Sequence, residues 1–222
     1  MNFEIIQIPL IISLFSIASY SDFKTRSVND GFWFSFGSVG LFLSFLSLDY
    51  NDVGSIIDFF LKLFLMMLTI FFIWILRFIG TADLFAFVTL SMITPKLLVE
   101  TLFPIFVTLL SIFLAIICTI VINTYYNIKT VLSQRLFLDV EESTCRKILA
   151  FFLIHKKQKF ETFCFQAVIQ IDNKKKFRFF HDLNNEEFYN DSDYVSSSLP
   201  MIPFMLLSIL VMFFLIGVEY LF

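Results

Sequence analysis

The chain has 222 residues, of which 58% are hydrophobic and 16% charged, with 33 phenylalanines and a mean hydropathy of +0.84. Because a soluble domain is about half apolar and about a quarter charged, this composition excludes an ordinary water-soluble globule and a disordered chain and indicates a membrane protein. The 6 glycines and 3 cysteines argue against a collagen repeat and a disulfide scaffold, and the net charge of −3 argues against nucleic-acid binding.

Six apolar stretches predict transmembrane helices, since a helix needs roughly 20 apolar residues to cross the hydrocarbon core. In chain order they are 5–21, 32–48, 56–76, 84–99, 102–124 and 200–221. The fourth is the weakest, because Pro95 and Lys96 interrupt it, and it is tolerable as a span only among other helices. We expect a polytopic α-helical membrane protein with a five-helix region at 1–124, a small α+β subdomain at 125–198 and the sixth helix at 199–222.

The basic residues predict the orientation of these spans. Eleven of the sixteen lie between Lys129 and Arg178, and three others, Lys24, Arg26 and Arg77, follow the first and third spans. With six spans, all these segments fall on one side, which the positive-inside rule assigns to the cytoplasm. We therefore expect a multi-pass cell-membrane protein with both termini outside and 125–198 cytoplasmic.

Residues 125–198 show mixed periodicity. Apolar residues at helical spacing in 143–155 predict a short amphipathic helix that lies at the membrane surface. Alternation over 163–171 predicts a strand, and the turn signal at 172–173 predicts a hairpin with the residues around Phe177. So small a segment is expected to have little core of its own and to lean on the helix bundle or the lipid.

Most charges near the spans have simple explanations. Asp58 and Lys62 are four residues apart and can pair on one helix face, as can Lys96 and Glu100. We expect both pairs to be surface charges whose long side chains extend toward the headgroups.

Asp22 and Asp83 differ, because they close the first span and open the fourth at the same cytoplasmic depth. Two carboxylates on different helices are the minimum equipment of an aspartic peptidase, in which one acid stays protonated while the other takes a proton from water. Gly80 is expected to let the chain approach closely before Asp83. The alternative is structural: Asp83 as a helix N-cap and Asp22 paired with Lys24 or Arg26.

The sequence lacks the residues that several other kinds of enzyme require. Both histidines lie in 125–198, so an intramembrane Ser–His protease is not indicated. No HExxH, GxxxxGK[ST] or GxGxxG motif occurs, and the cysteines have no metal-ligand spacing. We expect free thiols, no cofactor, no metal and no nucleotide.

The two aspartate segments resemble the motifs of the type IV prepilin peptidases, in their short archaeal preflagellin (prearchaellin) peptidase form. In that family an Asp after the first span precedes basic residues, Ile or Val, and Asn; here the segment reads Asp22-Phe23-Lys24-Thr25-Arg26-Ser27-Val28-Asn29. The second motif, GxGD, reads Gly80-Thr81-Ala82-Asp83, with Ala82 in place of the second glycine. A polar segment before a last span that begins near Pro200 and Pro203 completes the resemblance.

The resemblance implies Asp22 and Asp83 as catalytic residues, supported by Lys24, Arg26, Asn29, Gly80, Thr81 and Ala82. It implies cleavage of the short basic class III signal peptide of archaellin or type IV pilin-like precursors at the cytoplasmic membrane face. Such a precursor keeps its apolar helix in the bilayer and its leader in the cytoplasm. The acidic residues Glu186, Glu187, Asp191 and Asp193 either attract that leader or form a solvated loop.

Two other kinds of function stay open on the residues alone. A presenilin-like intramembrane aspartic protease normally has more spans and a tyrosine before its first aspartate, where Ser21 stands here. A small transporter or a non-catalytic membrane assembly factor would use the same composition, although no internal repeat of the hydrophobic halves is evident.

Overall fold

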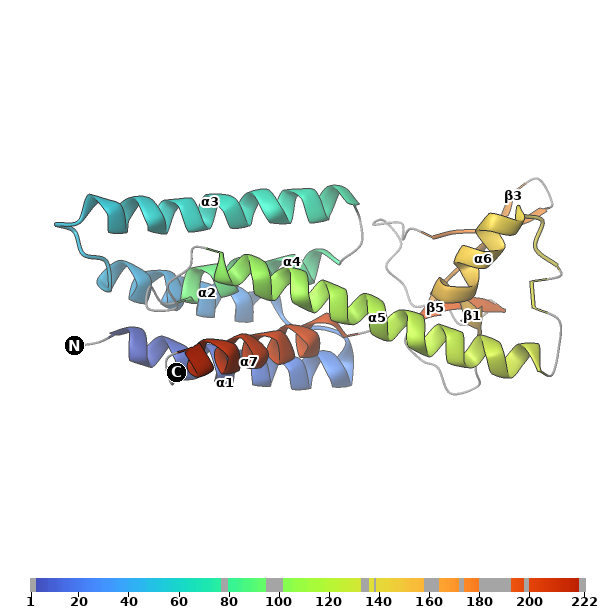
Figure 1. Cartoon of the computed structure of the whole chain (residues 1–222), viewed down its shortest axis with the longest axis horizontal. Helices are drawn as coiled ribbons and strands as arrows, with labels where there is room; N and C mark the ends of the chain where they lie inside the picture. Colours follow the sequence, from blue (N-terminus) through green and yellow to red (C-terminus); the bar gives the residue numbers. More distant parts are fainter. Residues whose placement is uncertain are drawn as a thin grey trace. The chain divides into compact units, whose positions relative to one another are not determined.

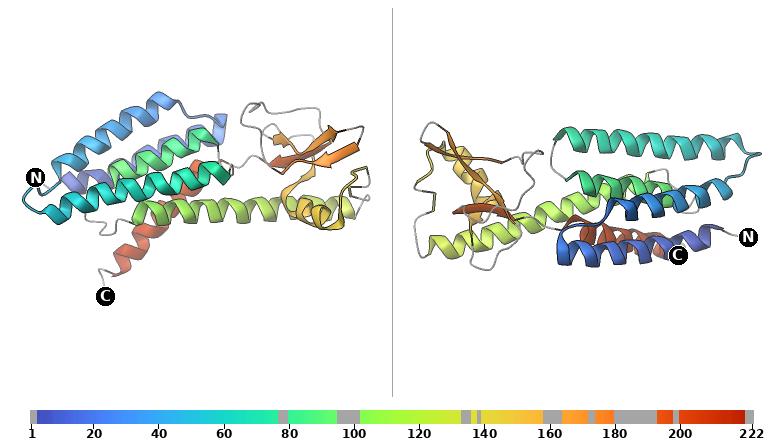
Figure 2. Two further views of the ribbon diagram at one scale, coloured as in Figure 1. Left: turned by 90° about the horizontal axis from the view of Figure 1, so that it is seen from above. Right: turned by 180° about the vertical axis from the view of Figure 1, so that it is seen from behind.

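The computed structural model describes residues 3–76, 80–94, 102–132, 136–137, 139–157, 164–171, 174–179, 193–197 and 200–219. The chain divides into two compact units. Unit 1 comprises Met1–Phe113 together with Pro200–Phe222, and unit 2 comprises Leu114–Leu199. Figures 1 and 2 show unit 1 as a bundle of helices and unit 2 as helices with short strands.

Unit 1 contains a helix in each stretch where the sequence predicts a span. The helices are α1 (Phe3–Thr25), α2 (Asp30–Leu46), α3 (Val53–Leu76), α4 (Thr81–Ile93), the first part of α5 (Phe103–Val131) and α7 (Met201–Glu219). Within the described residues, three segments are long and apolar enough to cross a membrane, namely Ile6–Thr25, Val53–Ile75 and Phe103–Val131, and the other three helices of unit 1 are apolar but shorter.

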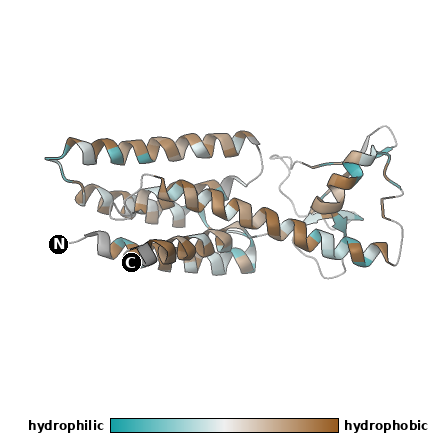
Figure 3. Ribbon diagram, in the orientation of Figure 1, coloured by the Kyte–Doolittle hydropathy of each residue, from teal (hydrophilic) through white to brown (hydrophobic). Residues whose placement is uncertain are grey.

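Hydrophobic residues predominate along α3 and α7 (Figure 3), and many of them are exposed, as in a protein solvated by lipid. On α3, Phe64 and Phe72 expose 64% and 57% of their surface, and on α7 Phe214 exposes 69%. An exposed apolar area of this extent is rare on a soluble monomer. Unit 1 is therefore compatible with a multi-pass membrane protein.

Helices α2 and α4 pack closely because α2 has small residues on the shared face. A Cβ atom at Gly40 would overlap the side chain of Ile93, whereas one at Gly37 would be 3.4 Å from Sδ of Met92. Trp33, one turn earlier, is 2% exposed, and its ring centroid lies 5.9 Å from that of Phe15 on α1. These contacts build the core of the bundle around α4.

The expected extent of the fourth span is wrong, because α4 ends at Ile93 and not at residue 99. Thr94, which precedes Pro95, has an extended conformation with ψ of 122°. A residue before proline is sterically disfavoured in the α conformation, and this ends the helix. Residues 95–100, including Lys96 and Glu100, lie outside the described part of the chain.

The expectation that Lys62 is a surface charge is wrong. It is 8% exposed, and its Nζ donates a hydrogen bond of 2.9 Å to the carbonyl of Thr94. Ser44 Oγ donates to the carbonyl of Met92 at 2.7 Å and accepts from Gln7 Nε2 at 3.1 Å. Side chains of α1, α2 and α3 thus meet at the end of α4, where the last carbonyls lack intrahelical donors. Asp58 is exposed and forms no ion pair with Lys62, both residues being described.

The described part of unit 2 combines the end of α5 with α6 (Thr144–Leu153) and five short strands. The strands are β1 (His155–Lys156), β2 (Cys164–Gln166), β3 (Val168–Ile171), β4 (Lys174–Phe177) and β5 (Tyr194–Ser197). One sheet has the order β1-β5-β2, and β3 pairs with β4 in a second. All pairs are antiparallel, with Val168 opposite Phe177 in the hairpin. The amphipathic helix and the hairpin are confirmed; β1 and β5 are additions to the expected elements.

The strand expected over 163–171 is divided in two at Ala167. Its N–H donates to the carbonyl of Tyr194 at 3.2 Å, while its carbonyl accepts from the N–H of Arg178 at 2.8 Å. Ala167 therefore joins the two sheets. Phe163 and the turn at 172–173 lie outside the described residues.

The expectation that 125–198 has little core is also wrong. Seven buried residues from α6, the strands and the 137–140 segment pack together: Phe137, Val140, Ala150, Ile154, Ala167, Phe177 and Tyr194. The Phe137 ring lies 5.0 Å from that of Phe177 and 5.1 Å from that of Tyr194. Unit 2 therefore has a hydrophobic core of its own.

Candidate active site

Asp22 lies in the last turn of α1 and is 7% exposed. Its Oδ2 accepts a hydrogen bond of 3.1 Å from the backbone N–H of Ile202, in the first turn of α7. The first N–H groups of a helix lack intrahelical acceptors and carry a partial positive charge, so a carboxylate is favoured there. Asp22 consequently fixes the end of α1 to the start of α7.

The chain leaves α1 through a short loop that is held by side-chain hydroxyls. Arg26 has a positive φ of 56°, which costs about 1–3 kcal/mol for a residue other than glycine. The carbonyl of Ser27 accepts from the hydroxyls of both Ser21 and Thr25 at 3.0 Å, and this holds the turn in place. Such a turn limits the movement of the helical turn that carries Asp22.

The basic residues of this segment have different environments. Burial lowers the pKa of the Arg26 guanidinium, and the adjacent Asp22 carboxylate raises it. Arg26 thus interacts electrostatically with Asp22, as the structural alternative for Asp22 expects. Lys24 is exposed and its Nζ lies 6.0 Å from the centroid of the Tyr20 ring. Asn29 is the N-cap of α2, and its side chain accepts from the N–H of Gly31 at 2.8 Å.

Asp83 lies in the first turn of α4, which begins directly after Gly80. Gly80 is the N-cap residue with an extended backbone, and its carbonyl accepts from the N–H of Asp83 at 3.2 Å. A Cβ atom at Gly80 would lie 3.7 Å from Oδ2 of Asp83, an ordinary van der Waals contact. The role expected of Gly80 stays a prediction. Thr81 and Ala82 form the first two positions of α4.

The helices that carry the two aspartates belong to one packed group. α1, α4 and α7 contact one another pairwise. Figures 1 and 2 show that the end of α1, the start of α4 and the start of α7 lie at the same end of the bundle. The structure thus brings Asp22 and Asp83 to one end of unit 1, on neighbouring helices.

No group of three or more His, Cys, Asp or Glu side chains suited to a metal occurs within the described residues. Cys118, Cys145 and Cys164 form no disulfide bond within the part of the chain that the structure describes. Among the acidic residues that were candidates for leader binding, Asp193 is described, and its Oδ2 lies 3.8 Å from Nζ of Lys175. Glu186, Glu187 and Asp191 lie outside the described residues.

The contact of Asp22 with Ile202 is absent from the sequence-based expectations. The available signal was Pro200 and Pro203, which mark a helix start, because a helix start offers free N–H donors to a buried carboxylate. Sequence spacing gives no indication of which carboxylate receives them, since the partners are 180 residues apart.

The model of the type IV leader peptidase family matches residues 9–120, just over half of the chain. This range includes Asp22 on α1, Asp83 on α4 and the first part of α5. A comparison with curated proteins finds no match.

Proposed function

Because the chain belongs to the type IV leader peptidase family, we propose that it is a membrane-embedded aspartic endopeptidase with Asp22 and Asp83 as its catalytic pair. Its substrates are archaellin or type IV pilin-like precursors, from which it removes a short basic leader at the cytoplasmic membrane face. The observation that carries this proposal is the position of both aspartates within the family match and at the same end of three contacting helices.

Hydrolysis needs one carboxylate and one carboxylic acid. The ionised aspartate takes a proton from a water molecule, whose oxygen attacks the scissile carbonyl carbon. The protonated aspartate donates a hydrogen bond and then its proton to the carbonyl oxygen. Collapse of the tetrahedral species breaks the C–N bond, and the amine leaves with a proton returned by the pair. No cofactor is needed for this sequence of proton transfers.

Ile202 and two residues of the first motif support Asp22 in this proposal. The N–H of Ile202 fixes one carboxylate oxygen, and Arg26 supplies a positive charge beside it. Asn29 starts α2 and thereby determines where the loop after α1 ends. These residues act as positioning groups, because each one contacts the backbone or Asp22.

The same proposal includes the topology that the charges favour. Six spans place both termini outside and 125–198 in the cytoplasm, with region boundaries after residues 124 and 198. The apolar segment of a precursor then lies in the bilayer beside the spanning helices, and its basic leader lies in the cytoplasm, as residues 125–198 do. The junction between leader and apolar helix offers the extended backbone that nucleophilic attack requires.

The test is a membrane processing assay with an archaellin or pilin precursor as substrate. The wild-type chain should produce a shorter product whose new N-terminus, read by mass spectrometry, lies at the junction between leader and apolar segment. Asp22→Asn and Asp83→Asn should each abolish this product at unchanged protein level. Asp58→Asn, an exposed acid on α3, is the matched control and should process normally. A product at unchanged yield from either active-site variant would refute the proposal.

A further inference from the structure

Helix α5 is longer than a bilayer requires. It has 29 residues, and at about 1.5 Å per residue it exceeds the roughly 30 Å hydrocarbon core. Residues 103–122 contain no Asp, Glu, Lys, Arg or Asn, whereas Asn123, Asn127 and Lys129 follow within two turns. The hydrocarbon therefore ends near Asn123 when α5 spans the membrane.

The C-terminus of α6 is fixed at this level of α5. Asn127 Nδ2 donates to the carbonyls of Phe151 and Ile154 at 2.7 and 2.6 Å, and Asn123 Nδ2 donates to the carbonyl of Phe152 at 3.1 Å. Asn123 Oδ1 also lies 2.7 Å from Nδ1 of His155. Because these bonds satisfy the last carbonyls of α6, its end cannot move away from Asn123 without leaving them unpaired.

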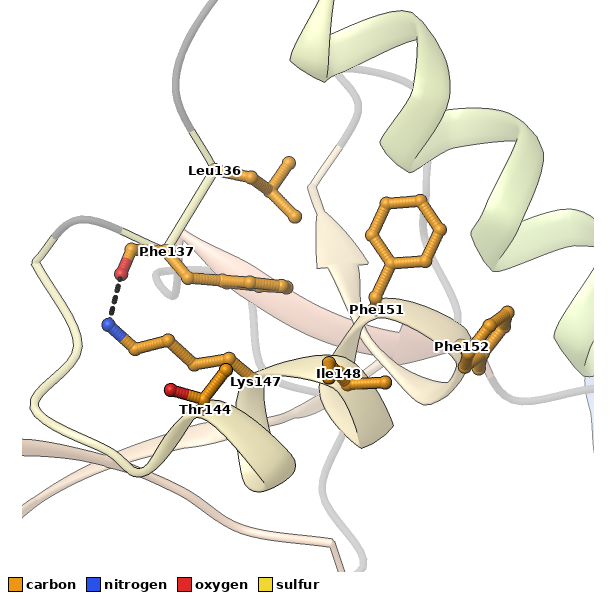
Figure 4. A pocket seen from close by; sticks show the side chains of 7 residues that line it. All are labelled: Leu136, Phe137, Thr144, Lys147, Ile148, Phe151 and Phe152. Carbon is orange, nitrogen blue, oxygen red and sulfur yellow. Dashed lines mark hydrogen bonds between the residues drawn. The ribbon is translucent and has the colours of Figure 1, made fainter.

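Helix α6 runs across α5 and not along it, as Figures 1 and 2 show. A helix that crosses a spanning helix lies closer to the membrane plane. The outer side of α6 is apolar: Ile148, Leu149 and Phe152 expose 58%, 49% and 40% of their surface. An apolar groove of about 310 Å³ runs along the same helix, with Leu136 and Phe151 among its walls (Figure 4).

The end of α5 also exposes an apolar side chain beyond the expected hydrocarbon boundary. Ile128 exposes 51% of its surface. Cationic side chains accompany both helices. Lys129 lies on α5, and on α6 Arg146 pairs with Glu142 while Lys147 Nζ donates to the carbonyl of Phe137 at 3.2 Å. Apolar residues beside Lys and Arg are typical of helices that lie in the interface of an anionic bilayer.

We propose that Ile148, Leu149 and Phe152 of α6, together with Ile128 of α5, form a membrane-contact face that inserts into the lipid interface of the bilayer that α5 spans. The occupant of this face is the acyl region of the lipids. The bonds to Asn123 and Asn127 set the depth, and the groove beside Phe151 gives acyl chains further apolar surface. This inference depends on α5 as a span and not on the proposed peptidase activity.

The experiment measures the depth of nitroxide labels on the full-length chain, reconstituted at one chain per nanodisc with anionic lipid. In a background with Cys118, Cys145 and Cys164 replaced and its thermal unfolding verified, labels are attached at Leu149→Cys and Phe152→Cys. Molecular oxygen, which concentrates in lipid, should relax both labels efficiently, whereas a water-soluble nickel chelate should relax them poorly. The matched control is Lys174→Cys on β4, which is exposed and polar and should show the reverse.

Nickel accessibility at 149 and 152 equal to that at 174 would overturn the proposal. So would protection that appears only when two chains share a nanodisc, which indicates a second copy, or only after a pilin-like precursor is added, which indicates the substrate. If either variant fails to fold, a label at Ile148→Cys replaces it, because Ile148 is the most exposed residue of the three.

Discussion

The backbone N–H of Ile202 donates a hydrogen bond of 3.1 Å to Oδ2 of Asp22, across 180 residues of sequence. This bond joins the last turn of α1 to the first turn of α7, and both helices contact α4, which carries Asp83. Asp22 thus has a structural role in addition to its proposed catalytic one. Because of this double role, activity alone is an incomplete readout for variants of Asp22.

Substitutions of Asp22 should separate the two roles. The amide oxygen of Asp22→Asn can still accept from Ile202, whereas Asp22→Ala removes the acceptor and leaves a buried N–H without it. We expect both variants to lose processing, and Asp22→Ala to be less stable than Asp22→Asn by about 1 kcal/mol, the typical value of a helix cap. Unfolding in detergent, followed by tryptophan fluorescence, measures the difference. Equal stability of the two variants would show that the bond to Ile202 contributes nothing.

The contact of α2 with α4 should discriminate between two glycines on the same helix. Gly40→Ala forces a methyl group into Ile93, and overpacking of this kind costs about 1–3 kcal/mol. Gly37→Ala is the matched control, since its methyl group would make ordinary contacts with Met92 and Thr89. Comparison of the unfolding midpoints of the two variants tests the packing, and equal midpoints would contradict it.

Lys62→Met should destabilise the bundle, because it removes the donor that binds the carbonyl of Thr94 at the end of α4. A buried acceptor left unpaired costs about 1–3 kcal/mol. The control is Asp58→Asn, one turn earlier on α3 and exposed, which should leave the unfolding midpoint unchanged. If Lys62→Met unfolds at the wild-type midpoint, the hydrogen bond to Thr94 makes no net contribution to stability.

The sequence predicts the helices of unit 1 better than their contacts. Hydropathy locates α1, α3 and α5 because a span must be about 20 residues of apolar sequence. The end of α4 was predictable from Pro95, since Thr94 adopts the extended conformation typical of a residue before proline. The burial of Lys62 and the partner of Asp22 could not be predicted, because both are set by tertiary packing between helices that are distant in the sequence. In unit 2, β1 has two residues, which is too short for a periodicity signal.

Tyr194 should govern the stability of unit 2 at high pH. Burial raises its pKa above the ordinary value of 10.0, although the hydrogen bond from the N–H of Phe137 opposes this change. A raised folded-state pKa means that the stabilisation is present below the unfolded pKa and is lost as the pH rises through the folded pKa. We therefore expect unit 2 to loosen above about pH 10.

The alkylation rate of the buried Cys164 thiol reports this loosening, in a background with Cys118 and Cys145 replaced. Tyr194→Phe should raise the rate at neutral pH, because the N–H of Phe137 loses its acceptor. Above about pH 10, the alkylation rate of Cys164 should rise less in the Tyr194→Phe variant than in the protein that keeps Tyr194, when the two are compared at the same pH. A parallel increase in both proteins would assign the alkaline loosening to another group.

The central claim, that Asp22 and Asp83 act as one catalytic pair, is tested most directly by a double-mutant cycle on the purified chain in lipid nanodiscs. Initial rates of precursor cleavage are measured for Asp22→Asn, Asp83→Asn and the combined variant. When two residues act as a unit, the effects of their mutations on the rate are strongly non-additive. The account predicts that each single variant and the double variant fall to the same residual rate. A single variant that retains most of the activity, or a double variant whose loss is the product of the two single losses, would contradict it.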